Sequence, residues 1–170
     1  MYKINRIYVY VILLIALFIH LTVLDYVKIF GAKPDIMLAC VIFFGLFAGA
    51  GMGLESGIAA GLMKDLYSLD FFGINTFVFA LTGLLAGMLS TNFFRESKRT
   101  QGLLVLFFTI FSMTMHYVLV SVFSKWLDLR FSEYLFTSII PAGIYTSLVA
   151  VPIFSRFIAM YDPREIEELL

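Results

Sequence analysis

Residues 45–65, GLFAGAGMGLESGIAAGLMKD, carry a glycine at every fourth position, and this stretch decides how the chain is interpreted. Residues four apart lie on nearly the same face of a helix, so the spacing leaves one face without side chains. A second backbone can approach such a face closely. The stripe therefore predicts tight helix packing, and its members are Gly45, Gly49, Gly53, Gly57 and Gly61, with Asp65 at the next position.

The composition indicates the class of protein in which such faces occur. Of the 170 residues, 61% are hydrophobic and 14% are charged, and the mean hydropathy is +0.96. A soluble domain is about one quarter charged and could not bury this much apolar surface. The sequence therefore predicts an integral membrane protein. The net charge of zero gives no case for nucleic-acid binding, and the single Cys40 cannot form an internal disulfide.

The apolar runs predict an all-α polytopic membrane protein, with six transmembrane helices in one bundle and one domain. A spanning helix needs about 20 apolar residues, and the second and third runs are shorter than that. One span over residues 36–54, followed by a non-spanning stretch, is the alternative. The turn is expected at residues 49–53, with kinks at Pro141 and Pro152. The expected spans are residues 7–24, 36–49, 55–69, 74–91, 102–123 and 134–158, with a short tail at 161–170.

The basic residues favour six spans with both termini in the cytoplasm. This arrangement places seven Lys and Arg side chains inside and five outside. The densest basic cluster, residues 95–99, then lies inside, as the positive-inside rule requires. Five spans would place that cluster outside.

The fourth run repeats the glycine pattern of the second and third. Asn75, Gly83 and Gly87 lie on one row with a spacing of four. We therefore expect the second, third and fourth runs to form the tight centre of the bundle, and the other three to be more exposed to lipid. The glycine faces either hold the bundle closed or receive a transmembrane helix of a partner.

Four ionisable residues in or beside the third run are candidates for a polar function: Glu55, Lys64, Asp65 and Asp70. An ionisable residue within a membrane indicates function by default. Glu55 lies beside the predicted inner turn and Asp70 in an outer loop, so contact with water explains both equally well. Asp65 either makes a buried structural hydrogen bond or contacts a partner or small ligand.

No sequence motif indicates catalysis, a cofactor or a metal. His20 and His116 lie in separate runs, and neither has a Cys, His or carboxylate three or four residues further on. The fingerprints of serine hydrolases, zinc proteases, P-loops and dinucleotide-binding folds are missing from the sequence. We therefore expect a protein that is not an enzyme.

Several short motifs resemble the MreD family of rod-shape-determining membrane proteins. Pro34-Asp35 opens the second run, the glycine-rich turn follows, and Gly61-Leu62 precedes Asp65-Leu66. Gly73-Ile74-Asn75 and the sequence LTGLLAG at residues 81–87 complete the resemblance, which covers about a third of the chain. The chain departs from the family at the inner turn after the second run, where the family is usually more positive and Glu55 is the only charge.

The resemblance implies a non-enzymatic component of the elongation machinery in the bacterial inner membrane. It implies an MreC-like bitopic membrane protein as a partner, together with MreB, RodA and a penicillin-binding transpeptidase. The residues expected at a partner or helix-packing interface are Pro34, Asp35, Gly45, Gly49, Gly53, Glu55, Gly57, Gly61, Asp65, Gly73, Asn75, Gly83 and Gly87.

The same family is similar in fold to the substrate-binding subunits of energy-coupling-factor transporters, which supplies an alternative function. Such a subunit binds a vitamin or metal in a polar pocket near the outer face. Asn75, Asp70 and Lys64 are the residues expected to cluster there. Against this alternative, the first run lacks an Ala-x-x-x-Ala surface for the coupling subunit, since Ala16 stands alone.

Overall fold

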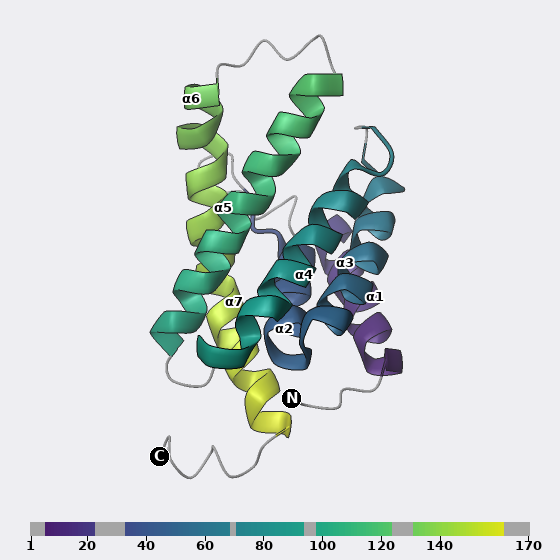
Figure 1. The fold of residues 1–170 in the computed structure, drawn as a ribbon, viewed down its shortest axis with the longest axis vertical. Helices are drawn as coiled ribbons and strands as arrows, with labels where there is room; N and C mark the ends of the chain where they lie inside the picture. The colour runs from purple at the N-terminus through teal and green to yellow at the C-terminus, as the bar shows by residue number, and fades with distance from the viewer. Residues whose placement is uncertain (1–5, 23–32, 69–70, 94–97, 124–130, 162–170) are drawn as a thin grey trace.

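The computed structural model describes residues 6–22, 33–68, 71–93, 98–123 and 131–161 (Figure 1). All regular secondary structure in these ranges is helical. The helices are α1 (Arg6–Thr22), α2 (Ile36–Ala48), α3 (Ala50–Asp65), α4 (Ile74–Phe93), α5 (Lys98–Phe123), α6 (Phe131–Tyr134), the π-helix η1 (Leu135–Ile139) and α7 (Ile140–Tyr161). The basic residue Arg95 and the tail beyond residue 161 lie outside the described ranges.

The chain reverses direction between α2 and α3 at one residue. Gly49 has a φ of 89°, a conformation that favours glycine, and its N–H donates to the carbonyl of Gly45 at 2.9 Å. The next helix starts immediately, so α3 covers residues 50–65 and not the expected 55–69, and the turn is shorter than residues 49–53. Gly49 alone completes the reversal, so the other glycines between residues 45 and 61 lie within α2 or α3. A single helix over residues 36–54 is therefore not formed.

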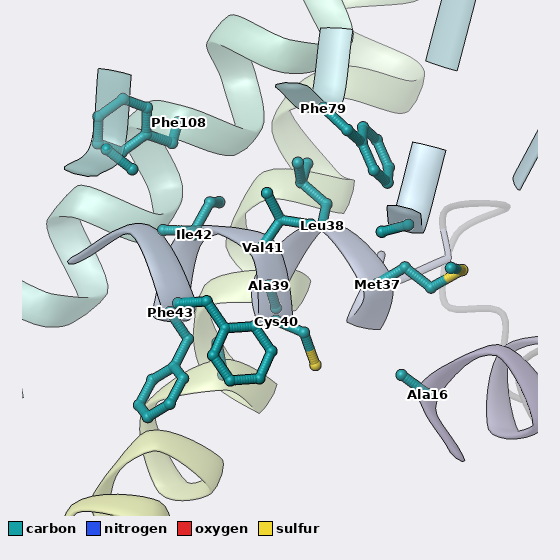
Figure 2. Close-up of a cluster of buried hydrophobic side chains, with 14 of the residues drawn as sticks. Ala16, Met37, Leu38, Ala39, Cys40, Val41, Ile42, Phe43, Phe79 and Phe108 are labelled. Atoms are coloured by element: carbon teal, nitrogen blue, oxygen red, sulfur yellow. The ribbon is translucent and has the colours of Figure 1, made fainter. Parts of the chain in front are cut away.

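Helix α2 lies at the centre of the bundle and is buried on nearly every side. It contacts α1, α3, α4, α5 and α7. Figure 2 shows its side chains pointing in several directions, toward Phe79 of α4, Phe108 of α5 and Ala16 of α1. A helix that is apolar all round, as this one is, is stable only when neighbours surround it.

The outer helices carry the exposed apolar side chains. Helix α1 buries one narrow face, made by Val9, Leu13 and Ala16, and exposes large side chains elsewhere. The α5–α7 pair, together with η1, also exposes large apolar side chains, which are Leu103, Phe107, Phe136, Ile144 and Leu148. Surfaces of this kind are typical of contact with lipid.

Two segments are long and apolar enough to cross a membrane, Arg99–Phe123 and Phe131–Arg156. By contrast, α2 has 13 residues and α3 has 16. At about 1.5 Å per residue they reach roughly 20–24 Å, which is less than the bilayer core of about 30 Å. Six membrane crossings therefore stay a prediction.

The last long segment contains a local change of helix type before Pro141. Residues 135–139 form a π-helix, in which the N–H of Ile140 donates to the carbonyl of Leu135. Proline has no N–H to donate, so a change in hydrogen-bond register beside it is a natural accommodation. Pro152 lies inside α7.

Candidate functional site

The glycines of α3 lie where this helix touches the backbone of α4. A Cβ atom added at Gly57 would lie 2.7 Å from Cα of Ala80, and one at Gly61 would lie 2.7 Å from the carbonyl oxygen of Asn75. Real Cβ atoms do not come closer than 3.0 Å to such neighbours. Only a residue without a side chain allows this approach, as in other small-residue contacts between membrane helices.

The same close contact continues where α2, α3 and α4 meet. A Cβ atom at Gly45 would lie 2.6 Å from the carbonyl oxygen of Gly83, and one at Gly53 would lie 2.8 Å from Cα of Gly45. One at Gly87 would lie 2.6 Å from the carbonyl carbon of Gly49. We call this set the glycine seam: Gly45, Gly53, Gly57, Gly61, Gly83 and Gly87.

The glycine seam is occupied by the chain itself. Its backbone contacts are all with α2, α3 or α4, so it is not an open groove for a partner's helix. In this structure the glycine faces pack against one another within the bundle, which is one of the two uses expected for them. Gly73 has a different role, because its φ of 99° shapes the turn before α4 and a Cβ there would meet nothing within 4 Å.

Asp65 ends the seam and caps the N-terminus of α4. Its Oδ1 accepts from the backbone N–H and the side-chain Nδ2 of Asn75, at 3.1 and 2.9 Å. Its Oδ2 accepts from the backbone N–H and the hydroxyl of Thr76, at 3.0 and 2.5 Å. A helix leaves its first N–H groups without internal partners, and a carboxylate there satisfies them and interacts favourably with the helix dipole. Asp65 is 4% exposed, so its role in this structure is the buried structural hydrogen bond.

Asp35 connects the start of α2 to two other helices. Its Oδ1 accepts from the N–H of Leu38 at 3.0 Å, and its Oδ2 pairs with Nζ of Lys64 at the end of α3. Its own N–H donates to the hydroxyl of Thr146 in α7 at 3.0 Å. Burial raises the pKa of the Asp35 carboxyl, but Lys64, the nearby His20 and the hydrogen bond from Leu38 together outweigh burial and lower that pKa overall. The preceding Pro34 is buried beside α7.

Glu55, in the first half of α3, connects this helix to the start of α1. Its Oε1 accepts from the hydroxyl of Tyr10 at 2.6 Å, and its Oε2 lies 3.4 Å from Nε of Arg6. The Glu55 side chain is 31% exposed and that of Arg6 is 72% exposed. Partial contact with water was expected for Glu55, whereas its link to α1 was not visible in the sequence.

A polar cavity of about 150 Å³ opens next to the Asp35–Lys64 pair. Its walls come from α2, α3, α4, α5 and α6, and it is lined by Asp35, Leu38, Lys64, Asn75, Val78, Phe79, Ser112, Met113, His116 and Tyr134. Two of the three residues expected at a polar pocket, Lys64 and Asn75, are brought together here. Asp70, the third, lies outside the described residues.

Sequence reasoning did not assign Ser112, His116 or Tyr134 to this cavity. Ser112 and His116 are four residues apart in an apolar helix, so a shared face was the available signal. That spacing does not say which helix the face meets. Tyr134 comes from a short helix whose position depends on how α7 packs against α5.

A closed seam of glycines, buried polar links between helices and an apolar exterior define an all-helical membrane protein whose core is fixed by backbone contact. The chain belongs to the MreD family, because the family model described as rod shape-determining protein MreD matches residues 1–161. Neither the curated proteins nor the solved structures compared with the chain gave a match.

Proposed function

We propose that this protein is a multi-pass, non-enzymatic component of the bacterial elongation machinery that binds other membrane proteins of that machinery. Membership of the MreD family over residues 1–161 carries the proposal. The direct partner is an MreC-like bitopic protein, which links the chain to MreB, RodA and a penicillin-binding transpeptidase. Because the glycine seam is filled within the chain, the partner binds to the outer apolar surface of the bundle.

The polar links support alternating directions for the first three helices, as the proposed six crossings with a cytoplasmic N-terminus require. Arg6 and Glu55 meet where α1 and α3 begin, and Asp35 and Lys64 meet where α2 begins and α3 ends. The first three helices therefore run in alternating directions, as successive membrane crossings do. The cavity then faces the outer side of the membrane.

Labelling tests this orientation. In a Cys40→Ala background, a membrane-impermeant thiol reagent added to intact spheroplasts should label Ser68→Cys but not Arg99→Cys. Opening the membrane should make Arg99→Cys reactive. Labelling of Arg99→Cys in intact spheroplasts would contradict the six-span arrangement.

Co-purification and complementation test the function itself. The tagged protein should retain an MreC-like protein in mild detergent, and cells lacking the chain should lose their rod shape. If these cells remain rods and no bitopic protein co-purifies, the proposed function is wrong.

One observation favours the second candidate, a substrate-binding subunit of an energy-coupling-factor transporter: the polar cavity that contains Lys64 and Asn75. The first helix argues against it. Ala16 is 3% exposed and packs into the core, so it is not available as a surface for a coupling subunit. Co-purification of a coupling subunit with ATPase subunits would favour transport.

A further inference from the structure

The polar cavity has room and position for a bound group that the family function does not require. Its volume of about 150 Å³ is roughly ten times the 10–15 Å³ that holds one water. It lies where α2 begins, α3 ends and α4 begins, and α5 contributes Ser112, Met113 and His116 to its wall. An empty space in a bundle is normally lined by apolar atoms, whereas this one also has the Asp35–Lys64 pair and the hydroxyls of Ser112 and Tyr134 in its wall.

Several polar groups in its wall have hydrogen-bonding capacity to spare. Lys64 has three N–H donors, and in the described part of the chain its polar partner is Asp35, with the ring centre of Phe79 4.8 Å from Nζ. Ser112 is 2% exposed, and it lies in the cavity wall. Its hydroxyl can donate a hydrogen bond to a group bound in the cavity and accept one from it.

The charges in the wall restrict the class of ligand. Asp35 and Lys64 have side chains 15% and 21% exposed, and as a pair they carry no net charge. A ligand with a net charge would bring an uncompensated charge into an apolar bundle, which is costly. A ligand with one charge of each sign can place its cation near Asp35 and its anion near Lys64, and so keep the site neutral.

The aromatic side of the cavity suits the cationic end of such a ligand. Tyr134 lines the cavity, and its ring stacks on Tyr117 with centroids 5.1 Å apart. Tyr117 and Phe131, whose ring centroids are 5.3 Å apart, support Tyr134 but are not among the residues that line the cavity. Aromatic faces attract ammonium groups. The π-helix η1 starts directly after Tyr134, and such segments are frequent at functional sites.

We propose that the cavity bounded by Asp35, Lys64, Ser112 and Tyr134 binds a small zwitterionic group, an ammonium joined to an anionic oxygen group. Its ammonium lies toward Asp35 and Tyr134, and its anionic oxygens accept from Lys64 and Ser112. This group is either the head of a zwitterionic phospholipid or a soluble zwitterion from the outer side. The inference does not rest on the proposed function, since a bound zwitterion is compatible with either candidate.

Native mass spectrometry in detergent provides the main test. The purified full chain is titrated with phosphatidylethanolamine and with phosphatidylglycerol of the same acyl chains, which differ in net charge. Free phosphoethanolamine and glycine are tested separately by their effect on the thermal unfolding temperature. Three proteins are compared: the unaltered chain, Ser112→Leu, which fills the cavity without touching the ion pair, and Ser121→Leu. The last is a matched control, because Ser121 lies on the same helix but is exposed and outside the cavity lining.

A lipid headgroup is the ligand if phosphatidylethanolamine binds at least about tenfold more tightly than phosphatidylglycerol, which corresponds to about 1.4 kcal/mol. This preference should persist in Ser121→Leu and disappear in Ser112→Leu. A soluble zwitterion is the ligand if phosphoethanolamine or glycine raises the unfolding temperature of the unaltered chain and Ser121→Leu, but not of Ser112→Leu.

Equal binding of the two lipids without any response to the soluble probes would overturn the proposal, as would binding that Ser112→Leu leaves unchanged. Should Ser112→Leu fail to fold, two variants replace it: Ser112→Ala, which removes only the hydroxyl, and the double variant Asp35→Asn with Lys64→Met, which removes both charges together. Retention of the lipid preference in both variants would equally refute the assignment.

Discussion

A single methyl group added to a glycine of α3 should have opposite effects at Gly57, which belongs to the glycine seam, and at Gly51, which does not. At Gly57 the added Cβ would lie 2.7 Å from Cα of Ala80, below the 3.0 Å limit for real contacts. The obstructing atoms are backbone atoms, so no side chain can rotate away, and α3 and α4 must separate. At Gly51, on the same helix, a Cβ would meet nothing within 4 Å. Gly51→Ala is thus a matched control for Gly57→Ala.

The magnitudes follow from packing and helix propensity. Overpacking a core typically costs about 1–3 kcal/mol, and more when the backbone must move. Replacing glycine by alanine in a helix gains up to about 1 kcal/mol where the space is open. Gly57→Ala should therefore be destabilised by about 2 kcal/mol or more relative to Gly51→Ala. Larger side chains, as in Gly57→Leu or Gly61→Leu, should prevent assembly of the bundle.

Thermal unfolding of the purified protein in detergent provides the measurement, with the helical circular dichroism signal followed for both variants. Gly51→Ala should unfold at or slightly above the temperature of the unaltered chain, and Gly57→Ala clearly below it. Equal unfolding temperatures for the two variants would show that backbone contact at the seam does not hold α3 to α4.

Substitutions at four residues, Asp65, Lys64, Asp35 and Glu55, test the polar links. Asp65→Asn should be milder than Asp65→Leu in a rod-shape complementation assay and in thermal unfolding, since Asn keeps one acceptor oxygen for the start of α4; equal loss would indicate a role for the charge. Lys64→Met should destabilise by about 3–5 kcal/mol because it leaves Asp35 partly buried and unpaired, and Asp35→Asn combined with Lys64→Met should recover much of that loss. Because the folded-state pKa of Asp35 is lowered, its carboxylate stabilises the fold above its ordinary pKa of about 4. This stabilisation is lost as the pH falls through the folded-state pKa. The loss of stability caused by Asp35→Asn should therefore shrink in acid. Glu55→Gln should cost no more than about 1 kcal/mol, because its pair with Arg6 is largely exposed, and a larger loss of unfolding temperature would contradict this.

The sequence predicted those features of the fold that depend on spacing within one helix. A glycine every four residues defines a face, and the structure places Gly57 and Gly61 at backbone contacts with α4. Asp65 was predicted to turn toward a neighbouring helix because it continues the same row, and it contacts α4. Its partners could not be identified, because the N–H groups of Asn75 and Thr76 lie in the first turn of α4, and the spacing within α3 does not show which helix end Asp65 meets.

The cavity was less predictable because it depends on contacts between distant segments. Asp35 and Lys64 are 29 residues apart, and the N–H of Asp35 reaches Thr146, 111 residues further along the chain. A hydrophobic periodicity shows which face of α5 is apolar but not which helix it meets. The sequence therefore does not assign Ser112 or His116 to a cavity, and their place in its wall depends on how α5 packs.

The closed seam changes where a partner protein can bind. Between helices in lipid there is no hydrophobic driving force, so association depends on close packing and a few hydrogen bonds. Helices α2, α3 and α4 already pack against one another through their glycine faces. Asp65 and the Asp35–Lys64 pair already make polar contacts between these helices. What remains outside is the exposed apolar surface of α1 and of the α5–α7 pair. Substitutions in the glycine seam should therefore weaken partner binding only as far as they unfold the bundle. Replacing exposed Phe107 or Leu148 by a side chain of different size should instead change partner binding without changing the unfolding temperature. If Gly57→Ala abolished co-purification of the partner while leaving the unfolding temperature unchanged, the seam itself would be the docking face and this reasoning would be wrong.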